Sequence, residues 1–322
     1  MIVYLDQNAI WELAINRKRC PHLERLRHIL QKGHHDNLLL CPIPPETILE
    51  TIGVESKQDR LCVYTLQCEL ASVAGQTIAF KAFNKLLEED SLAMVRGQPR
   101  TSRFEPCFWH SVEDELFTLQ NRPNIEQAKK MWGDGFTRLS STLESCSLNA
   151  ENASHGIRSE HAAHLFRQIE KLEKGLSPDR GDDGHLAYDL ITYLTYQNVN
   201  SEELSRLKEA VINRRWEAIP VVFYRACLAA ELEVRYRSPR GAMRFHPNNQ
   251  IDIARMTVAM ESASVVITER QMAAFFNTVV HGLNKKLFKI QGENWGDKKA
   301  FGISEAEEAS HFIERTMRLD LM

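Results

Sequence analysis

The stretch MIVYLDQNAIWEL (residues 1–13) begins with apolar residues and then turns polar. Ile2 to Leu5 are apolar and largely β-prone, and the run stops at Asp6, so a short buried strand ending in a carboxylate is expected. Ligands of open α/β sheets bind at the carboxyl ends of the strands, which makes Asp6 a candidate site residue. A structural explanation stands beside it, since Asp6 can also cap the helix expected to follow.

Length and composition indicate an ordinary globular protein. The chain has 322 residues, 43% of them hydrophobic, which is enough for a core in one large domain or two. The formal net charge is −3. This charge excludes a global basic field, so any surface that binds nucleic acid must be local.

Cysteine usage and the lack of targeting signals indicate a cytoplasmic protein. The seven cysteines are scattered, with no C-x-x-C pair and no histidine at zinc-finger spacing. Such cysteines are typical of reduced, mostly buried thiols in a cytosolic protein. No signal peptide precedes the first strand, and no apolar run approaches the roughly 20 residues that cross a bilayer.

Hydrophobic periodicity predicts an α/β alternation in the first part of the chain. It indicates two helical pieces over residues 9–30 with a break at Cys20 and Pro21, a buried strand over 38–43, and a helix over about 46–53. Pro44 and Pro45 suit the start of that last helix. Glu46 and Glu50 then lie on one face of it, four residues apart.

The middle and the end of the sequence differ in character. Residues 58–235 have helical periodicity and no convincing strand. Toward the end, the pattern predicts helices over 250–263, 271–283 and 304–319, the last capped by Ser304, and strands over 264–268, 287–290 and 300–303. We therefore expect an α/β fold, a parallel sheet flanked by helices formed by residues 1–57 and 236–322, interrupted by a mostly α-helical insertion, residues 58–235.

Four acids occupy comparable positions in this expected fold. Asp6 and Glu269 each follow a buried strand, whereas Asp252 and Glu50 lie on helices beside predicted strands. The helix dipole stabilises the charge of a carboxylate in the first turn, where Asp252 is expected. Four carboxylates at one sheet edge repel one another, and Mg²⁺ or Mn²⁺ relieves that repulsion because hard cations bind carboxylate oxygens. Such a site can activate water and stabilise a phosphate in the transition state.

Three segments resemble the PIN-like nuclease domain. They are Val-Tyr-Leu-Asp-Gln-Asn at residues 3–8, Pro-Ile-Pro-Pro-Glu-Thr-Ile-Leu-Glu-Thr at 42–51, and Ile-Asp-Ile-Ala-Arg-Met-Thr-Val-Ala-Met-Glu-Ser-Ala-Ser-Val-Val-Ile-Thr-Glu-Arg at 251–270. The resemblance implies that the family's first to fourth metal-binding acids are Asp6, Glu50, Asp252 and Glu269. It also implies that Asn8 and Thr268 support the site by hydrogen bonding.

The sequence departs from the family in two places. Glu269 stands where Asp is common, and Ser264 stands where a charged residue usually precedes the final strand. These departures leave open whether Glu269 binds metal directly or through water. Glu46 competes with Glu50 for the second position, and the family spacing favours Glu50. Glu46 then supports the site from one turn earlier or is an ordinary surface residue.

The resemblance implies a divalent-metal-dependent endoribonuclease that hydrolyses phosphodiester bonds, with a toxin or antiviral effector as a possible role. RNA is expected over DNA from the resemblance alone. The insertion would serve as a lid, a substrate guide or a homodimerisation surface. The alternative is a catalytically inactive PIN-like scaffold that binds RNA or a protein partner.

A basic stretch precedes the helix that contains Asp252. Its arginines alternate with aromatic residues, a pattern that suits a nucleic-acid backbone and its bases but also a solvated loop. The candidate nucleic-acid-binding residues are Arg235, Arg237, Arg240, Arg244 and His246. A second polar cluster can be explained by a helix start or by a metal site. It consists of Asp182, Asp183, His185 and Asp189.

Two competing folds do not match the opening strand. A haloacid-dehalogenase-like phosphatase needs a second aspartate two residues after the first, where this sequence has Asn8. A dinucleotide-binding fold needs a glycine-rich turn after the strand, and none follows Asp6.

Overall fold

The computed structural model describes residues 1–16, 20–52, 54, 56–107, 190, 193–212, 220–221, 224–225, 227–228, 231–232, 249–285 and 298–319. The chain forms two compact units. The first comprises Met1–Lys81, Arg103–Glu126 and Val258–Met322, and the second comprises Ala82–Ser102 and Gln127–Thr257. The expected division into 1–57 with 236–322 and an insertion over 58–235 stays a prediction, and these units divide the chain at other residues.

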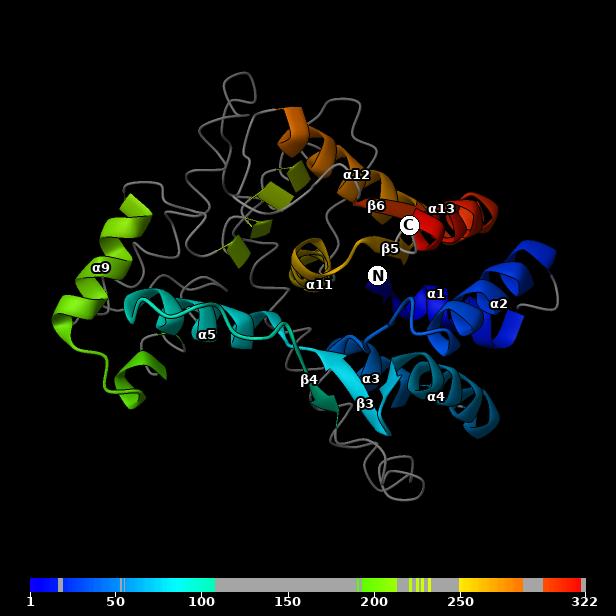
Figure 1. Cartoon of the computed structure of the whole chain (residues 1–322), viewed down its shortest axis with the longest axis horizontal. Coiled ribbons are helices and arrows are strands. Elements are labelled where there is room, and N and C mark those ends of the chain that lie inside the picture. Colours follow the sequence, from blue (N-terminus) through cyan, green and yellow to red (C-terminus); the bar gives the residue numbers. More distant parts are fainter. Residues whose placement is uncertain are drawn as a thin grey trace. The chain divides into compact units, whose positions relative to one another are not determined.

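A three-stranded parallel sheet forms the centre of the first unit. Its order is β1 (Val3–Leu5), β5 (Val265–Thr268) and β6 (Lys299–Gly302). All residues of β1 and β5 are buried, as expected for parallel strands covered on both faces. The two ends of the chain therefore meet in one sheet, with the blue N-terminal strand beside β5 (Figure 1), and the expected α/β class is confirmed.

Helices surround this sheet in the first unit. They are α1 (Gln7–Trp11), the π-helical η1 (Glu12–Asn16), α2 (Pro21–His35), α3 (Pro45–Ile52), α4 (Lys57–Ala71), α12 (Arg270–Lys285), the 3₁₀ turn η8 (Ile303–Glu305) and α13 (Ala306–Leu319). A further helix, α11 (Asn249–Ser262), leads into β5. The helices predicted over 46–53, 250–263, 271–283 and 304–319 are thereby confirmed, as is the break before Pro21. Strand β6 confirms the prediction for 300–303, whereas 287–290 lies outside the described residues.

The predicted cap of the closing helix is wrong. Ser304 lies inside η8, so it does not stand just before α13. The side chain of Glu305 instead accepts a hydrogen bond from the backbone N–H of Gly302 at 2.9 Å. The chain therefore leaves β6 through a 3₁₀ turn that is closed by a carboxylate, as expected for an acid near a helix start.

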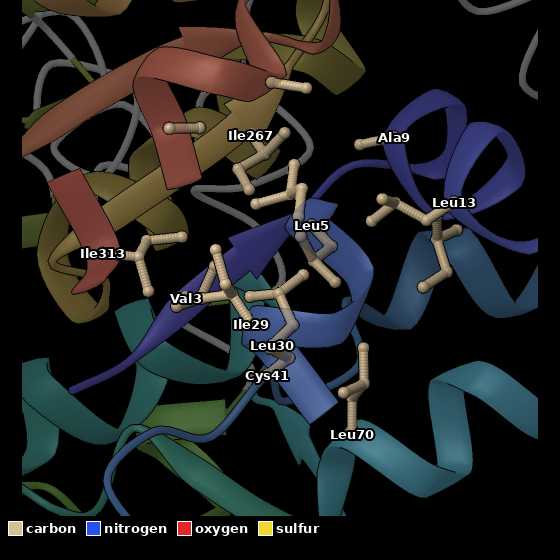
Figure 2. Close-up of a cluster of buried hydrophobic side chains, with 14 of the residues drawn as sticks. Val3, Leu5, Ala9, Leu13, Ile29, Leu30, Cys41, Leu70, Ile267 and Ile313 are labelled. Atoms are coloured by element: carbon tan, nitrogen blue, oxygen red, sulfur yellow. The ribbon is translucent and has the colours of Figure 1, made fainter. Parts of the chain in front are cut away.

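One face of the parallel sheet packs against α2, α4 and α13. Val3 and Leu5 of β1 and Ile267 of β5 contribute to a cluster that also contains Leu30 of α2 and Ile313 of α13 (Figure 2). Fully burying a side chain of this kind contributes about 1.5–3 kcal/mol to the free energy of folding. The cluster therefore anchors both strands whose carboxyl ends bear Asp6 and Glu269.

The predicted strand over 38–43 is wrong as a continuous strand. Leu40 bridges in parallel to Ile2, and Ile43 bridges to Ala79 of another sheet. Between them the N–H of Cys41 donates to the carbonyl of Leu70 at 3.0 Å. The run is buried and extended, but its backbone bonds to three different partners, so no regular ladder forms.

The expectation of no strand within residues 58–235 is also wrong. An antiparallel sheet of order β2–β3–β4 forms from β2 (Ser72–Val73), β3 (Gln76–Phe80) and β4 (Phe104–Cys107). Ala74 and Gly75 connect the first two strands with φ angles of 51° and 80°. Two residues with positive φ match the tight turn of a β-hairpin. Strand β2 has only two residues, too few for the alternation to stand out between flanking helices.

Helices also form the described part of the second unit. They include α5 (Phe83–Val95) and α9 (Ser201–Ile212), joined by a hydrogen bond of 3.3 Å from the Arg206 guanidinium to the carbonyl of Val95. Arg96, just after α5, donates to the carbonyl of Gln197 at 2.7 Å. Within the residues that the structure describes, no helix of either unit is both long enough and apolar enough to cross a bilayer.

Because the Cys41 thiol is buried, the free energy of unfolding of the protein decreases at alkaline pH. Burial raises the pKa of this thiol far above its ordinary value, opposed by the nearby chain terminus. The unfolded chain then loses the thiol proton near pH 8.5 while the folded chain keeps it, so stability is complete below that pH and decreases by about 1.4 kcal/mol per pH unit above it. We expect Cys41→Ala to weaken the decrease in melting temperature between pH 8 and pH 10.

The control for this prediction is Cys62→Ala, a change at a partly exposed thiol of α4. It should leave the pH dependence of the melting temperature as in the wild type. An equal effect of the two substitutions would contradict the assignment to burial. Scanning calorimetry at closely spaced pH values measures both curves.

Candidate functional site

Asp6 lies directly after β1, where the chain enters α1. Its backbone N–H donates to the carbonyl of Ile267 in β5 at 3.0 Å. The carboxylate accepts on both sides, with Oδ1 2.7 Å from the N–H of Gln7 and Oδ2 2.7 Å from the hydroxyl of Thr268. Asp6 is therefore the cap of α1. This role does not exclude ligand binding, because a carboxylate has about four lone pairs and these contacts use two.

The end of β5 meets the end of β1 at this position. The register pairs Leu5 with Ile267, so Asp6 and Thr268 follow at the same edge of the sheet. Thr268 is completely buried, and its hydroxyl fixes one oxygen of Asp6. The hydrogen bonding expected of Thr268 is thus present, while a role in metal binding stays a prediction.

Asn8 connects the start of α1 to Glu269. Its side-chain amide donates to Oε1 of Glu269, although the two residues are 261 positions apart in the sequence. Both side chains are exposed, so the carboxylate is open to solvent. Asp6 and Glu269 are therefore linked through Thr268 and Asn8 at the same edge of the sheet.

Glu50 lies on α3, the helix whose Thr51 contacts the residue that follows Asp6. Its side chain is half-buried, and the next residue, Thr51, is completely buried. The hydroxyl of Thr51 lies 3.3 Å from Oε1 of Gln7, which joins α3 to the first residue after Asp6. Glu46 lies in the first turn of the same helix, and the choice between Glu46 and Glu50 stays a prediction.

Asp252 belongs to the second unit and lies in the first turn of α11, as predicted. Its Oδ1 is 4.0 Å from Nη1 of Arg255, one turn later, and its side chain is 31% exposed against 8% for Arg255. The helix start and the arginine both place positive charge near this carboxylate. Asp252 lies inside α11 and not at its cap, so the pair with Arg255 accounts for it locally, and a ligand role stays a prediction.

The carboxyl end of β6 is packed tightly against the start of α12. Gly302 pairs with Thr268, and a Cβ atom at Gly302 would lie 2.9 Å from the Cα atom of Arg270. Real Cβ atoms do not approach a backbone so closely, and only glycine allows this contact. Because Arg270 follows Glu269 directly, Gly302 helps to set the position of the segment that carries Glu269.

Several predicted site residues lie outside the described part of the chain. They are the basic candidates Arg235, Arg237, Arg240, Arg244 and His246, and the polar cluster Asp182, Asp183, His185 and Asp189. Their predicted contacts with nucleic acid or metal therefore stay predictions.

The donor types at the sheet edge suit a hard cation, but the described residues do not form a complete ligand set. Asp6 and Glu269 at this edge, and Glu50 on α3, offer carboxylate oxygens, the ligands that Mg²⁺ and Mn²⁺ prefer. Among the residues that the structure describes, no group of three or more His, Cys, Asp or Glu side chains is arranged to hold a metal ion. The residues therefore suit a metal ion in the chemistry of their donor atoms and in the place of Asp6 and Glu269 at the sheet edge.

Sequence reasoning missed the polar side chains that join the helices behind the site. Thr51 contacts both Gln7 and Gln67, and Thr51 and Gln67 are buried. The available signal was Gln67 itself, a glutamine between apolar neighbours on α4. The helical pattern of that segment explained it as an ordinary helix residue.

Comparison with protein-family models, with curated proteins and with solved structures finds no match for this chain.

Proposed function

We propose that this protein is a divalent-metal-dependent nuclease with a PIN-like fold that hydrolyses phosphodiester bonds in RNA. The observation that carries the proposal is the junction of β1 and β5, where Thr268 donates to Asp6 and Asn8 donates to Glu269. Two carboxylates fixed at the carboxyl edge of a parallel sheet lie where α/β folds bind their ligands. Their preference for hard cations supports a metal-dependent reaction on a phosphate.

In this proposal Asp6, Glu50, Asp252 and Glu269 bind Mg²⁺ or Mn²⁺. The ion, when bound, supplies an activated water and neutralises charge on the phosphate. Thr268 holds one rotamer of Asp6, and Asn8 orients Glu269, so both carboxylates are set before a substrate arrives. Asp252 enters the proposal from the sequence pattern alone, as do the preference for RNA and the PIN-like assignment.

The test is cleavage of a fluorescently labelled single-stranded RNA by the full chain. We expect cleavage with Mn²⁺ or Mg²⁺, loss of cleavage with excess EDTA and its return when Mn²⁺ exceeds the chelator, because carboxylates alone do not activate water sufficiently. DNA of the same sequence tests the preference for RNA. A folded protein that cuts neither polymer with any divalent ion would overturn the proposal.

The second candidate is a catalytically inactive PIN-like scaffold that binds RNA or a protein partner. It is favoured by the absence, among the described residues, of a group of three side chains arranged for a metal. The discriminating measurement is isothermal titration calorimetry with Mn²⁺. Uptake of Mn²⁺ by the wild type that is lost in Asp6→Asn supports the nuclease, whereas RNA binding without any metal uptake supports the scaffold.

A further inference from the structure

A chain of polar side chains runs through the interior of the first unit, from α4 through α3 to α1. On α4, the amide Nε2 of Gln67 lies 3.4 Å from the hydroxyl of Thr51 and 3.5 Å from that of Thr47, both on α3. The hydroxyl of Thr51 in turn lies 3.3 Å from Oε1 of Gln7 on α1. Thr47 and Thr51 are completely buried, and Gln67 is 7% exposed.

The threonines do not need Gln67 in order to satisfy their own hydroxyl protons. Thr47 donates to the carbonyl of Pro44 at 2.8 Å, and Thr51 donates to the carbonyl of Thr47 at 2.8 Å. An apolar side chain at position 67 would therefore leave no hydroxyl proton without an acceptor. Replacing a buried polar group by an apolar one of similar shape is nearly neutral when its partners stay satisfied. Stability alone thus gives little reason for a glutamine at this position.

The network touches the residues next to two candidate site acids. Gln7 follows Asp6, and its N–H donates to Oδ1 of that carboxylate at 2.7 Å. Thr51 follows Glu50 at the end of α3. Gln67 reaches Thr51 from a third helix, and the Thr51 hydroxyl in turn lies against Gln7, so this series of contacts limits how α1 and α3 rotate and shift against each other. The spacing between the two carboxylates depends on that arrangement.

We propose that Gln67 is a positioning residue, which holds α3 and the start of α1 so that Glu50 and Asp6 keep a fixed geometry. Its contribution to activity rests on the nuclease function proposed above. Gln67 does not touch the reacting groups. It acts through Thr51 and Gln7, so its removal loosens the carboxylates without removing them, and substrate binding outside the metal centre is unaffected.

The variant Gln67→Met tests this inference, because methionine has a similar volume and fills the space without hydrogen bonding. The matched control is Gln58→Met, the same change on the exposed first turn of α4. If Gln67→Met folds poorly, a second pair of variants tests the same contact. Thr51→Val removes the hydroxyl, and Thr51→Ser retains it. Thr51→Val should have the same effects as Gln67→Met, and Thr51→Ser should behave like the wild type in each measurement.

The first measurement is independent of activity. Amide hydrogen exchange by NMR reports the N–H groups of Gln7 and Ile10, which donate to the side chain and the backbone of Asp6. In Gln67→Met we expect both amides to exchange about tenfold faster, because the junction opens locally more often. The Gln58→Met control should match the wild type. Unchanged exchange at both amides in Gln67→Met would overturn the inference.

The second measurement separates positioning from mere packing. In Gln67→Met we expect kcat to decrease about tenfold and the Mn²⁺ affinity to weaken, with KM for RNA within about twofold of the wild type. A lower melting temperature with unchanged kcat and Mn²⁺ affinity would overturn the positioning role. The two proposals can fail separately. If amide exchange is faster in Gln67→Met while the wild type neither binds Mn²⁺ nor cleaves RNA, the nuclease proposal fails, and the role of Gln67 in holding α1 and α3 stands.

Discussion

Asp6→Asn is expected to lower kcat for metal-dependent RNA cleavage about a thousandfold while the protein stays folded. Asparagine caps helices as well as aspartate, and its oxygen can still accept a hydrogen bond. The substitution therefore preserves one acceptor for the N–H of Gln7 or the hydroxyl of Thr268. It removes the negative charge that binds the cation, and this loss accounts for the large effect on kcat.

The controls for Asp6→Asn separate charge from structure. Asp6→Ala removes the cap as well as the charge, and the cap alone contributes about 0.5–2 kcal/mol to stability. Asp36→Asn makes the same chemical change at an exposed position after α2 and should leave kcat unchanged. Circular dichroism and thermal melting verify the fold of each variant. Full Mn²⁺-dependent cleavage by a folded Asp6→Asn protein would remove the proposed role of this carboxylate.

Asn277→Ala is expected to lower the free energy of unfolding of the first unit by about 2–4 kcal/mol. The side-chain amide of Asn277 on α12 pairs with both backbone groups of Ala300, accepting from its N–H at 2.9 Å and donating to its carbonyl at 2.7 Å. Ala300 is 1% exposed, so water does not replace these bonds readily. Alanine leaves a buried donor and a buried acceptor without a partner, and each such group is costly.

The matched control for this prediction is Asn84→Ala, the same change at an exposed position of α5. Because alanine is the best helix former, that control should be neutral or slightly stabilising. Scanning calorimetry or urea unfolding compares the two variants. An equal small effect in both would show that the contacts of Asn277 with β6 contribute little to stability.

Asn277 also protects the edge of the parallel sheet. Among the residues that the structure describes, β6 is the last strand in the order β1–β5–β6, and the bonds from Asn277 occupy backbone groups that face away from β5. Unpaired edge groups are templates for pairing with another chain. The helix α12 therefore covers these groups, which is one of the means by which native proteins prevent such pairing.

Local patterns in the sequence were sufficient for the elements that bear the site. The apolar run ending at Asp6 predicted β1, and the run before Glu269 predicted β5, because strands buried on both faces give continuous apolar segments. The first-turn position of Asp252 on α11 also followed from its local sequence. The hairpin of β2 and β3 did not, because its first strand has two residues and lies between helical patterns.

By itself, then, the sequence determined that two buried strands end in acidic residues and that helices follow them, since burial and helix starts depend on neighbouring residues. Only the tertiary structure decided that Thr268 donates to Asp6, that Asn8 donates to Glu269, and that Gln67 reaches α3 from α4. These contacts join residues far apart in the chain, and their geometry depends on packing and register. Hydrophobic periodicity contains no information on which polar side chains will meet.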